Sequence, residues 1–219
     1  MNQRIGIYGG TFNPIHLGHL IVAEDVLIQK KLDKIIFVPN AHPPHKEATY
    51  LLPPEQRFEM VKLALDDSDF FELSDIEMVK DGYSYTSNTM SYFATRFPGD
   101  TLFFIIGADS LFEIHLWKNI EQLISHFSFI IARRRGSSLT AENINRIPLS
   151  ANLKGKLMEG VVHTPFIEIS GTMIRNRRAE GKSIRYLVPD RVRRYIINNK
   201  LFEKGGLDHR PAYDCQKIS

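Results

Sequence analysis

The sequence predicts an α/β fold, a Rossmann-like open parallel sheet with helices on both faces. Short apolar runs alternate with longer amphipathic segments along the 219 residues, as in proteins whose parallel strands are joined by helices. The most apolar run, residues 101–106 (TLFFII), is typical of a central strand that is covered on both faces. There is no internal repeat or low-complexity segment, so residues 1–204 are expected to form one domain.

Each expected strand is a short apolar run that ends at a turn. Glycine ends the first run at Gly9, and proline ends the second at Pro39. The six expected strands are residues 5–8, 34–38, 70–76, 101–106, 127–132 and 166–169.

Each expected helix repeats apolar residues at helical spacing, as Leu20 and Ala23 do in the first. Pro54 is acceptable because it lies in the first turn of the second helix. Residues 205–219 mix glycine, proline and charge without periodicity, and they are expected to form a flexible tail. The five expected helices are residues 17–30, 54–65, 87–96, 172–178 and 190–199.

The composition excludes several classes of protein. Hydrophobic residues make up 43% and charged residues 24%, which indicates a folded core rather than a disordered chain. The single cysteine, Cys215, excludes an internal disulfide and a cysteine-based metal site. The net charge of +3 is too small to indicate nucleic-acid binding without a local basic patch. No signal-peptide core and no membrane-spanning run is visible, so a cytoplasmic protein is expected.

The stretch GGTFNPIHLGH, residues 9–19, lies where the first expected strand ends and the first helix begins. Ligands of open α/β sheets bind at this edge. Glycines let backbone N–H groups approach a ligand closely, and the start of a helix favours an anion. His16 and His19 are three residues apart and should project from one side of the helix. Neither G-x-G-x-x-G nor a P-loop motif is present.

Three interpretations of this stretch compete. In the first, the two histidines are incidental to a structural helix start. In the second they bind zinc, but there is no nearby cysteine and Glu24 lies too far along to complete a ligand set. The third is phosphate binding, which fits best because imidazole and backbone N–H groups are donors and no acidic residue lies among them.

Two motifs resemble those of the nucleotidyltransferase superfamily, which includes the class I aminoacyl-tRNA synthetases. Residues 9–19 resemble its signature G-x-F-x-P-x-H-x-G-H. Residues 169–175, ISGTMIR, resemble its second element, Ser-Ser-Thr-x-Ile-Arg, with Gly171 where serine is usual. The two together are more specific than either alone.

Three further stretches resemble bacterial nicotinate-nucleotide adenylyltransferases. They are PNAHPPHK at residues 39–46, GYSYT at residues 82–86, and FFIIGADSL, which is followed by Trp117. The likeness extends from residue 4 to about residue 202. Arg135 replaces a proline that is frequent in the family, and the tail is longer than expected.

The resemblance implies that the adenylyl group of ATP is transferred to nicotinate mononucleotide, giving nicotinate adenine dinucleotide (deamido-NAD) and pyrophosphate in NAD biosynthesis. It also implies Mg²⁺, held mainly by the ATP phosphates and by no protein side chain. The attacking phosphate monoester is already largely dianionic at neutral pH, so the reaction needs no general base. It needs cations and hydrogen-bond donors that hold two polyanions together.

By resemblance, the catalytic residues are His16, His19 and Arg175, with His19 closest to the transferred phosphoryl group. An alternative for Arg175 is a solvated arginine on a basic helix. Asp109 is expected to accept a hydrogen bond from the ribose, or to cap a helix that starts near Leu111. The expected ATP-binding residues are Gly9, Gly10, Thr11, Phe12, His16, His19, Gly107, Asp109, Ser170, Thr172 and Arg175.

The mononucleotide is expected to contact a second set of residues. The face of Trp117 suits a flat pyridinium cation, although a lone tryptophan is more often a core residue. Thr86 and N–H groups near Trp117 are expected to bind the nicotinate carboxylate. His45 and Lys46 either face phosphate from a stiff PPHK loop or belong to an ordinary exposed turn. The expected mononucleotide-binding residues are His45, Lys46, Tyr85, Thr86, Trp117, Lys118 and Arg134.

Two other functions are considered. A sister transferase acting on phosphopantetheine would share both motifs, but it would not need Trp117 and GYSYT as a platform for a ring. A nucleic-acid-binding protein is suggested by the basic residues between Arg175 and Arg194, but few aromatic residues lie among them. The expected partners are therefore ATP and nicotinate mononucleotide, without nucleic acid or membrane, and a homodimer is left open.

Overall fold

The computed structural model describes residues 2–42, 51–78, 85–134 and 139–203. Within them, six strands form one sheet in the order β3-β2-β1-β4-β5-β6, and every neighbouring pair is parallel. The strands are β1 (Arg4–Gly10), β2 (Lys34–Pro39), β3 (Phe71–Leu73), β4 (Thr101–Gly107), β5 (Ser128–Arg134) and β6 (Val161–Thr164).

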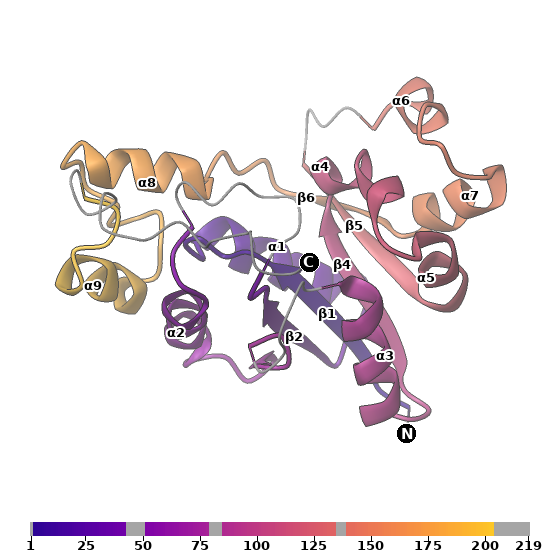
Figure 1. Cartoon of the computed structure of the whole chain (residues 1–219), viewed down its shortest axis with the longest axis horizontal. Helices are drawn as coiled ribbons and strands as arrows, with labels where there is room; N and C mark the ends of the chain where they lie inside the picture. Colours follow the sequence, from indigo (N-terminus) through magenta and orange to yellow (C-terminus); the bar gives the residue numbers. More distant parts are fainter. Residues whose placement is uncertain (1, 43–50, 79–84, 135–138, 204–219) are drawn as a thin grey trace, which may run out of the picture.

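Helices cover both faces of this sheet (Figure 1). The described helices are α1 (Leu17–Gln29), α2 (Pro54–Leu65), α3 (Thr86–Arg96), α4 (Ala108–Leu111), the 3-10 helix η2 (Ile114–Leu116), α5 (Ile120–His126), α6 (Ala141–Asn145), α7 (Ala151–Glu159), α8 (Gly171–Ala179) and α9 (Asp190–Asn198). Of these, α2, α8 and α9 gather at one end of the molecule, and α4 to α7 gather at the other (Figure 1).

Two hydrophobic cores lie on opposite faces of the sheet because successive strand residues point to opposite sides. In β4, Phe103 and Ile105 join the core formed with α1, α2, α8 and α9. Phe104 and Ile106 join the other core, formed with α3, α4, α5 and α7. The central strand is therefore apolar along its length, as its sequence predicts.

The strand order reverses beside β1. This strand pairs with β2 on one side and with β4 on the other. Gly10 at its carboxyl end pairs with Pro39, the last residue of β2. Such a switch point leaves a crevice beyond the strand ends where ligands of open α/β sheets bind. The loop that follows the paired glycines starts at this switch point.

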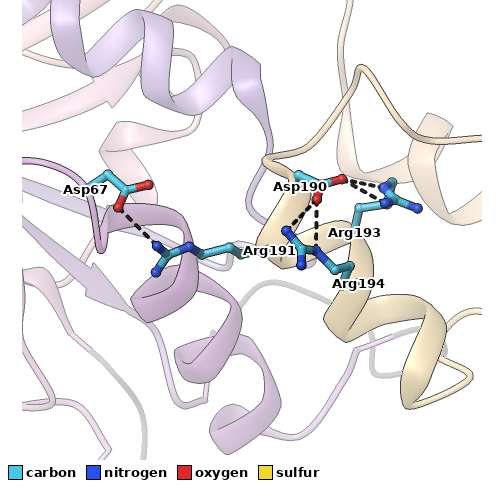
Figure 2. Close-up of polar contacts among 5 residues, drawn as sticks. All are labelled: Asp67, Asp190, Arg191, Arg193 and Arg194. Carbon is cyan, nitrogen blue, oxygen red and sulfur yellow. Dashed lines mark hydrogen bonds and ion pairs between the residues drawn. The ribbon is translucent and has the colours of Figure 1, made fainter.

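Helix α9 is joined to the end of α2 by ion pairs (Figure 2). Arg191 contacts Asp66 and Asp67, which follow the last turn of α2. On α9 itself, Asp190 accepts hydrogen bonds from Arg193 and Arg194, each at 2.8 Å. The basic residues of this segment are thus partly neutralised by acids within the fold.

The predicted α/β class and the open parallel sheet are confirmed, but one expected strand is wrong. The sixth strand is β6 (Val161–Thr164), and residues 165–169 lie in neither a helix nor a strand. Pro165 follows β6, and proline cannot donate to a strand ladder. Phe166, the most apolar residue of the expected strand, is 58% exposed.

The sequence pattern also gave no bounds for five helices, which are α4, η2, α5, α6 and α7. Four of these five have seven residues or fewer, so the helical period repeats too few times in them to be read. The fifth, α7, has nine residues and was missed although α9, of equal length, was predicted. Among the described residues, no helix is both long and apolar enough to span a membrane. The expected tail, residues 205–219, lies outside the described residues, and the limit of the domain at residue 204 stays a prediction.

Candidate active site

The loop after β1 holds a glycine against an aromatic ring. Phe12 has a φ of 46° and is 2% exposed, with its ring edge-on to Tyr8 at 5.7 Å between centroids. A Cβ on Gly10 would lie 2.8 Å from the Phe12 ring. A residue other than glycine would therefore push the ring out of the core. Gly9 lies within β1, opposite Val38 of β2.

His16 and His19 lie side by side at the start of α1. Their rings stack with centroids 3.7 Å apart and an interplanar angle of 21°, so the expected common side of the helix is confirmed. The backbone N–H of His16 donates to Nδ1 of His19 at 3.2 Å. A neutral imidazole that accepts at Nδ1 carries its proton on Nε2. The structure thus gives His19 a donor at the ring nitrogen farther from the backbone.

The helix-start interpretation and the phosphate interpretation are compatible in this geometry. His16 is the N-cap residue of α1 and is 3% exposed, so it is a structural part of the helix start. His19 is half-buried and lies between the His16 ring and the edge of Phe12, whose centroid is 5.1 Å away. Of the two histidines, His19 is the more exposed.

Arg175 joins the second motif to the first. Its Nη1 donates to the backbone carbonyl of Asn13 at 2.8 Å, and its Nη2 donates to Oγ1 of Thr172 at 3.1 Å. Partial burial lowers the pKa of the guanidinium from its usual value. Arg175 is therefore not the solvated arginine of the alternative interpretation. Ser170 caps α8 by accepting a hydrogen bond from the N–H of Met173 at 3.2 Å.

Gly171 has a steric role at this junction. A Cβ at this position would lie 2.9 Å from the carbonyl oxygen of Asn13 and 3.2 Å from Nη1 of Arg175. The departure from the usual serine therefore permits the close approach of α8 to the first loop. A backbone hydrogen bond also joins the start of α1 to the segment between α8 and α9, since the N–H of Leu17 donates to the carbonyl of Leu187 at 3.0 Å.

Gly107 and Asp109 lie at the carboxyl end of β4, beside the first loop. Gly107 is the N-cap of α4, so the expectation that Asp109 caps this helix is wrong. Asp109 is exposed in the first turn and keeps its carboxylate for another partner. A Cβ on Gly107 would meet no atom within 4 Å, which leaves open space in front of this backbone.

The two stretches expected to bind the mononucleotide come together. The ammonium of Lys118 lies 4.6 Å from the centroid of the Tyr85 ring, which joins the segment after η2 to the start of α3. Thr86 is the first residue of α3 and is half-buried. Trp117 is edge-on to Phe104 at 5.9 Å and packs against the core while remaining half-buried. Its core role and a ligand role are therefore compatible.

Three expected residues cannot be placed at this site. His45 and Lys46 lie outside the described residues. The backbone of Arg134 ends β5 opposite Thr164, but its side chain is outside what the structure describes.

Sequence reasoning missed Arg57. This side chain is 0% exposed and donates to carbonyls of the first loop and of the residues that follow β2. A signal was present, because Arg57 shares the buried face of α2 with Met60 and Val61. A charged residue at a core position of an amphipathic helix indicates a specific polar partner.

The comparisons with known proteins agree with the motifs. A family model described as cytidylyltransferase-like matches residues 7–177. A nicotinate-nucleotide adenylyltransferase of Bacillus subtilis is 39% identical over 201 residues, which cover 92% of this chain and 99% of the relative. The chain belongs to the nicotinate-nucleotide adenylyltransferase family. The family resemblance predicted from the two motifs is thus confirmed.

Other family members show the same extent of likeness. A protein of Caldicellulosiruptor saccharolyticus, named a probable nicotinate-nucleotide adenylyltransferase, is 43% identical over 203 residues, covering 92% of this chain and 100% of that one. A solved structure of the Plasmodium falciparum nicotinic acid mononucleotide adenylyltransferase complexed with NaAD is 20% identical and has a TM-score of 0.71. It covers 92% of this chain and 98% of its own, so the whole adenylyltransferase fold is shared.

Proposed function

We propose that the chain transfers the adenylyl group of ATP to nicotinate mononucleotide, forming deamido-NAD and pyrophosphate. The observation that carries this proposal is the contact of Arg175 with the Asn13 carbonyl. It brings two motifs with anion-binding chemistry to one edge of the sheet. The names of the relatives support the choice of substrates.

The reaction forms a bond between a phosphate oxygen of the mononucleotide and the α-phosphorus of ATP. The bond from that phosphorus to the bridging oxygen of the β-phosphate breaks, and pyrophosphate carries away the electron pair. The attacking dianion needs no base, so the site must position it and stabilise charge on the leaving group. We assign this work to Nε2–H of His19 and to the guanidinium of Arg175.

His19 and Arg175 suit a reaction in which Mg²⁺ is bound by ATP and not by protein side chains. Mg²⁺ prefers phosphate oxygens and water, and it supplies neutralisation of the triphosphate charge. Around His19 and Arg175 the protein offers donors, which complement phosphate rather than a cation. In the described parts of the chain, no three His, Cys, Asp or Glu side chains come together as a metal site. We therefore propose that the phosphates hold the ion.

The second substrate would occupy the region between α3 and η2. We propose that the indole of Trp117 stacks on the pyridinium ring and that Thr86 binds its carboxylate. The contact of Lys118 with Tyr85 supports this assignment, because it joins two stretches that are 33 residues apart in the chain. A phosphopantetheine acceptor has no aromatic ring and would leave this arrangement unused.

An acceptor assay tests the proposal. The protein is incubated with ATP and Mg²⁺ and with nicotinate mononucleotide, nicotinamide mononucleotide or phosphopantetheine, and pyrophosphate is measured. We expect release with nicotinate mononucleotide, and we expect EDTA to abolish it. Release with phosphopantetheine alone, or undiminished release in EDTA, would contradict the assignment.

A further inference from the structure

Arg57 of α2 is a fully buried cation that makes four hydrogen bonds to backbone carbonyls. Its Nε donates to Leu52 at 3.0 Å, and its Nη2 donates to Ala41 at 2.9 Å. Its Nη1 donates to Thr11 at 2.9 Å and to Asn40 at 2.5 Å. The guanidinium therefore connects the loop after β1, the residues after β2, and the residue pair that precedes α2.

Burial disfavours the charged form of the Arg57 side chain. Desolvation lowers the pKa of Arg57 to about 10, although Glu55 and Glu77 favour its charged form. At neutral pH it remains protonated and keeps all its donors. An apolar residue would pack beside Met60 without placing a charge in the core. The four carbonyl acceptors therefore explain why a charged residue lies at this position, and the packing of α2 does not.

The acceptors lie in the loop after β1 and on either side of a stretch expected to bind the mononucleotide. Ala41 and Leu52 lie before and after residues 43–50, which carry His45 and Lys46 in the sequence. Thr11 lies within GGTFNPIHLGH. One rigid, planar group thus holds Ala41 and Leu52 together with the middle of the loop after β1.

The planarity of the peptide group extends this control to the opposite side. In a trans peptide the C=O and the following N–H point in opposite directions. Because the Thr11 carbonyl points at Arg57, the N–H of Phe12 points away from it. The same holds for the N–H of His42, which follows the Ala41 carbonyl. Arg57 therefore sets the direction in which the backbone N–H groups of Phe12 and His42 point.

A second contact links this cluster to Arg175. The N–H of Leu52 donates to the side-chain Oδ1 of Asn13 at 3.3 Å. The backbone carbonyl of the same Asn13 accepts from Arg175 at 2.8 Å. A shift of Leu52 would therefore move Asn13, and with it the carbonyl to which the guanidinium of Arg175 donates. We assign that guanidinium to the ATP phosphates.

We propose that Arg57 is a positioning residue, which holds the loop after β1 in one fixed relation to the described residues on either side of residues 43–50. This inference rests on the proposed function, since that function assigns the loop after β1 to ATP and His45 and Lys46 to the mononucleotide. Arg57 is fully buried, so we place it in contact with neither substrate. Its loss should misplace both substrates together, whereas loss of a contact residue should affect only one.

The test compares Arg57→Lys with Met60→Ala. Lysine keeps the charge but has one nitrogen, which cannot reach four carbonyls in three directions. Met60 is also 0% exposed and lies on the same face of α2, so Met60→Ala is a control for destabilisation of the helix. Thermal unfolding of both variants is measured first, and kinetics are measured well below both midpoints.

For Arg57→Lys we expect kcat to fall about a hundredfold, the scale of a misplacement of about 1 Å, and both KM values to rise. Met60→Ala should keep kcat within about threefold. Equal activity of the two variants would overturn the proposal. So would a defect toward one substrate only.

Hydrogen exchange supplies a readout that does not depend on turnover. In folded Arg57→Lys, amides of residues 11–13, 41–42 and 51–52 should exchange faster, while those of β1 and β4 stay protected. Unchanged exchange would overturn the proposal even if the wild type used another acceptor. Arg57→Gln is the second variant. If neither variant folds while Met60→Ala does, Arg57 serves folding and not positioning, which also overturns it.

Discussion

His19 contributes to the start of α1, and we propose a chemical role for the same side chain. Its Nδ1 accepts the N–H of His16, and this bond directs the proton of the neutral ring to Nε2. In the proposed function, this hydrogen bond of the helix start makes Nε2 the nitrogen that carries the donor. The sequence pattern predicts phosphate binding, and the geometry adds that Nδ1 is the ring nitrogen that accepts the N–H of His16.

His19→Ala is expected to lower kcat about a hundredfold, because one donor to the developing charge is lost. It should also cost about 1 kcal/mol of stability, since the helix start loses one hydrogen bond. Steady-state kinetics and thermal unfolding check the two effects separately. His126→Ala, an exposed histidine at the end of α5, is the control and should leave both unchanged. Near-normal turnover of His19→Ala would return this histidine to a purely structural role.

Gly107→Ala tests whether ATP lies against the backbone of Gly107, because the substitution should not disturb the packing of the protein. A Cβ at Gly107 meets no protein atom within 4 Å, so folding should be little changed. If ATP lies against this backbone, the new methyl group should raise the KM for ATP about tenfold or more and leave the KM for the mononucleotide nearly unchanged. Gly155→Ala in α7 is the matched control, with equally open space but no place in the site. It should gain about 0.5–1 kcal/mol of helix stability. An unchanged KM for ATP in Gly107→Ala would remove Gly107 from the site.

At the scale of elements, long periodic segments were predictable and short ones were not. The sequence located α1, α2 and α9 to within a residue or two, because each repeats its apolar face over several turns. It misplaced the sixth strand, because FIEI has three apolar residues and VVHT has only two, yet it is VVHT that pairs with β5. Pairing is a property of the sheet, and a single strand does not encode it.

The same limit applies to the site. The motifs indicated His19, Arg175 and Gly107 as candidate residues because the stretches that carry them lie at or near the ends of β1, β4 and α8, where elements of an open α/β sheet face a ligand. For Arg57, its place on the buried face of α2 indicates a polar partner, but its four acceptors are carbonyls, which every residue has. No side-chain pattern in the sequence marks a backbone acceptor, so such a contact is found only once the loops are placed in space.

Asp190→Asn tests the start of α9. The hydrogen bond from Arg193 and the charges of Arg193 and Arg194 lower the pKa of Asp190 below its usual 3.8 (Figure 2). A carboxylate with a lowered pKa stabilises the fold above its unfolded pKa, and this contribution is lost as the pH falls through the folded value. The unfolding temperature of the variant should therefore lie below that of the wild type at pH 7. The difference should shrink as the pH falls below about 3.8.

The control for this measurement is Asp69→Asn, an exposed carboxylate beyond the end of α2. It should match the wild type at neutral pH. A difference for Asp190→Asn that persists unchanged at the lowest pH would show that the asparagine perturbs packing and that the charge is not responsible.

At the scale of the molecule, the site is an assembly of distant segments around the switch point of the sheet. The first loop follows β1, Gly107 follows β4, and Arg175 arrives from α8. The proposed pocket for the second substrate joins α3 to the segment after η2. A cytoplasmic location and a homodimer stay predictions from the sequence.

This arrangement predicts a preference for the acid over the amide. Thr86 and nearby N–H groups are donors, which suit a carboxylate, whereas the amide would turn its own NH₂ donor toward them; such mismatches can reach about 10⁴-fold in kcat/KM. Thr86→Ala should narrow this ratio, measured with the two mononucleotides. Trp117→Ala should instead raise the KM for both mononucleotides and leave that for ATP nearly unchanged.

Thr95→Ala, an exposed threonine of the same helix, is the control for Thr86. It should keep the ratio of the wild type. Equal use of the two mononucleotides by the wild type, or a Trp117→Ala variant impaired only toward ATP, would show that the ring lies elsewhere.

The contact between Arg175 and Asn13 joins residues 162 positions apart, and this has a consequence for synthesis. Ribosomes add about 5–20 residues each second, so Asn13 is made roughly 8–30 s before its partner. During that interval the first loop has a strand behind it but no α8 to hold it. A nascent chain that stops before residue 175 contains the residues of β1 to β6 but lacks the guanidinium that we assign to the ATP phosphates. The ability to bind ATP is thus among the last properties that the growing chain acquires.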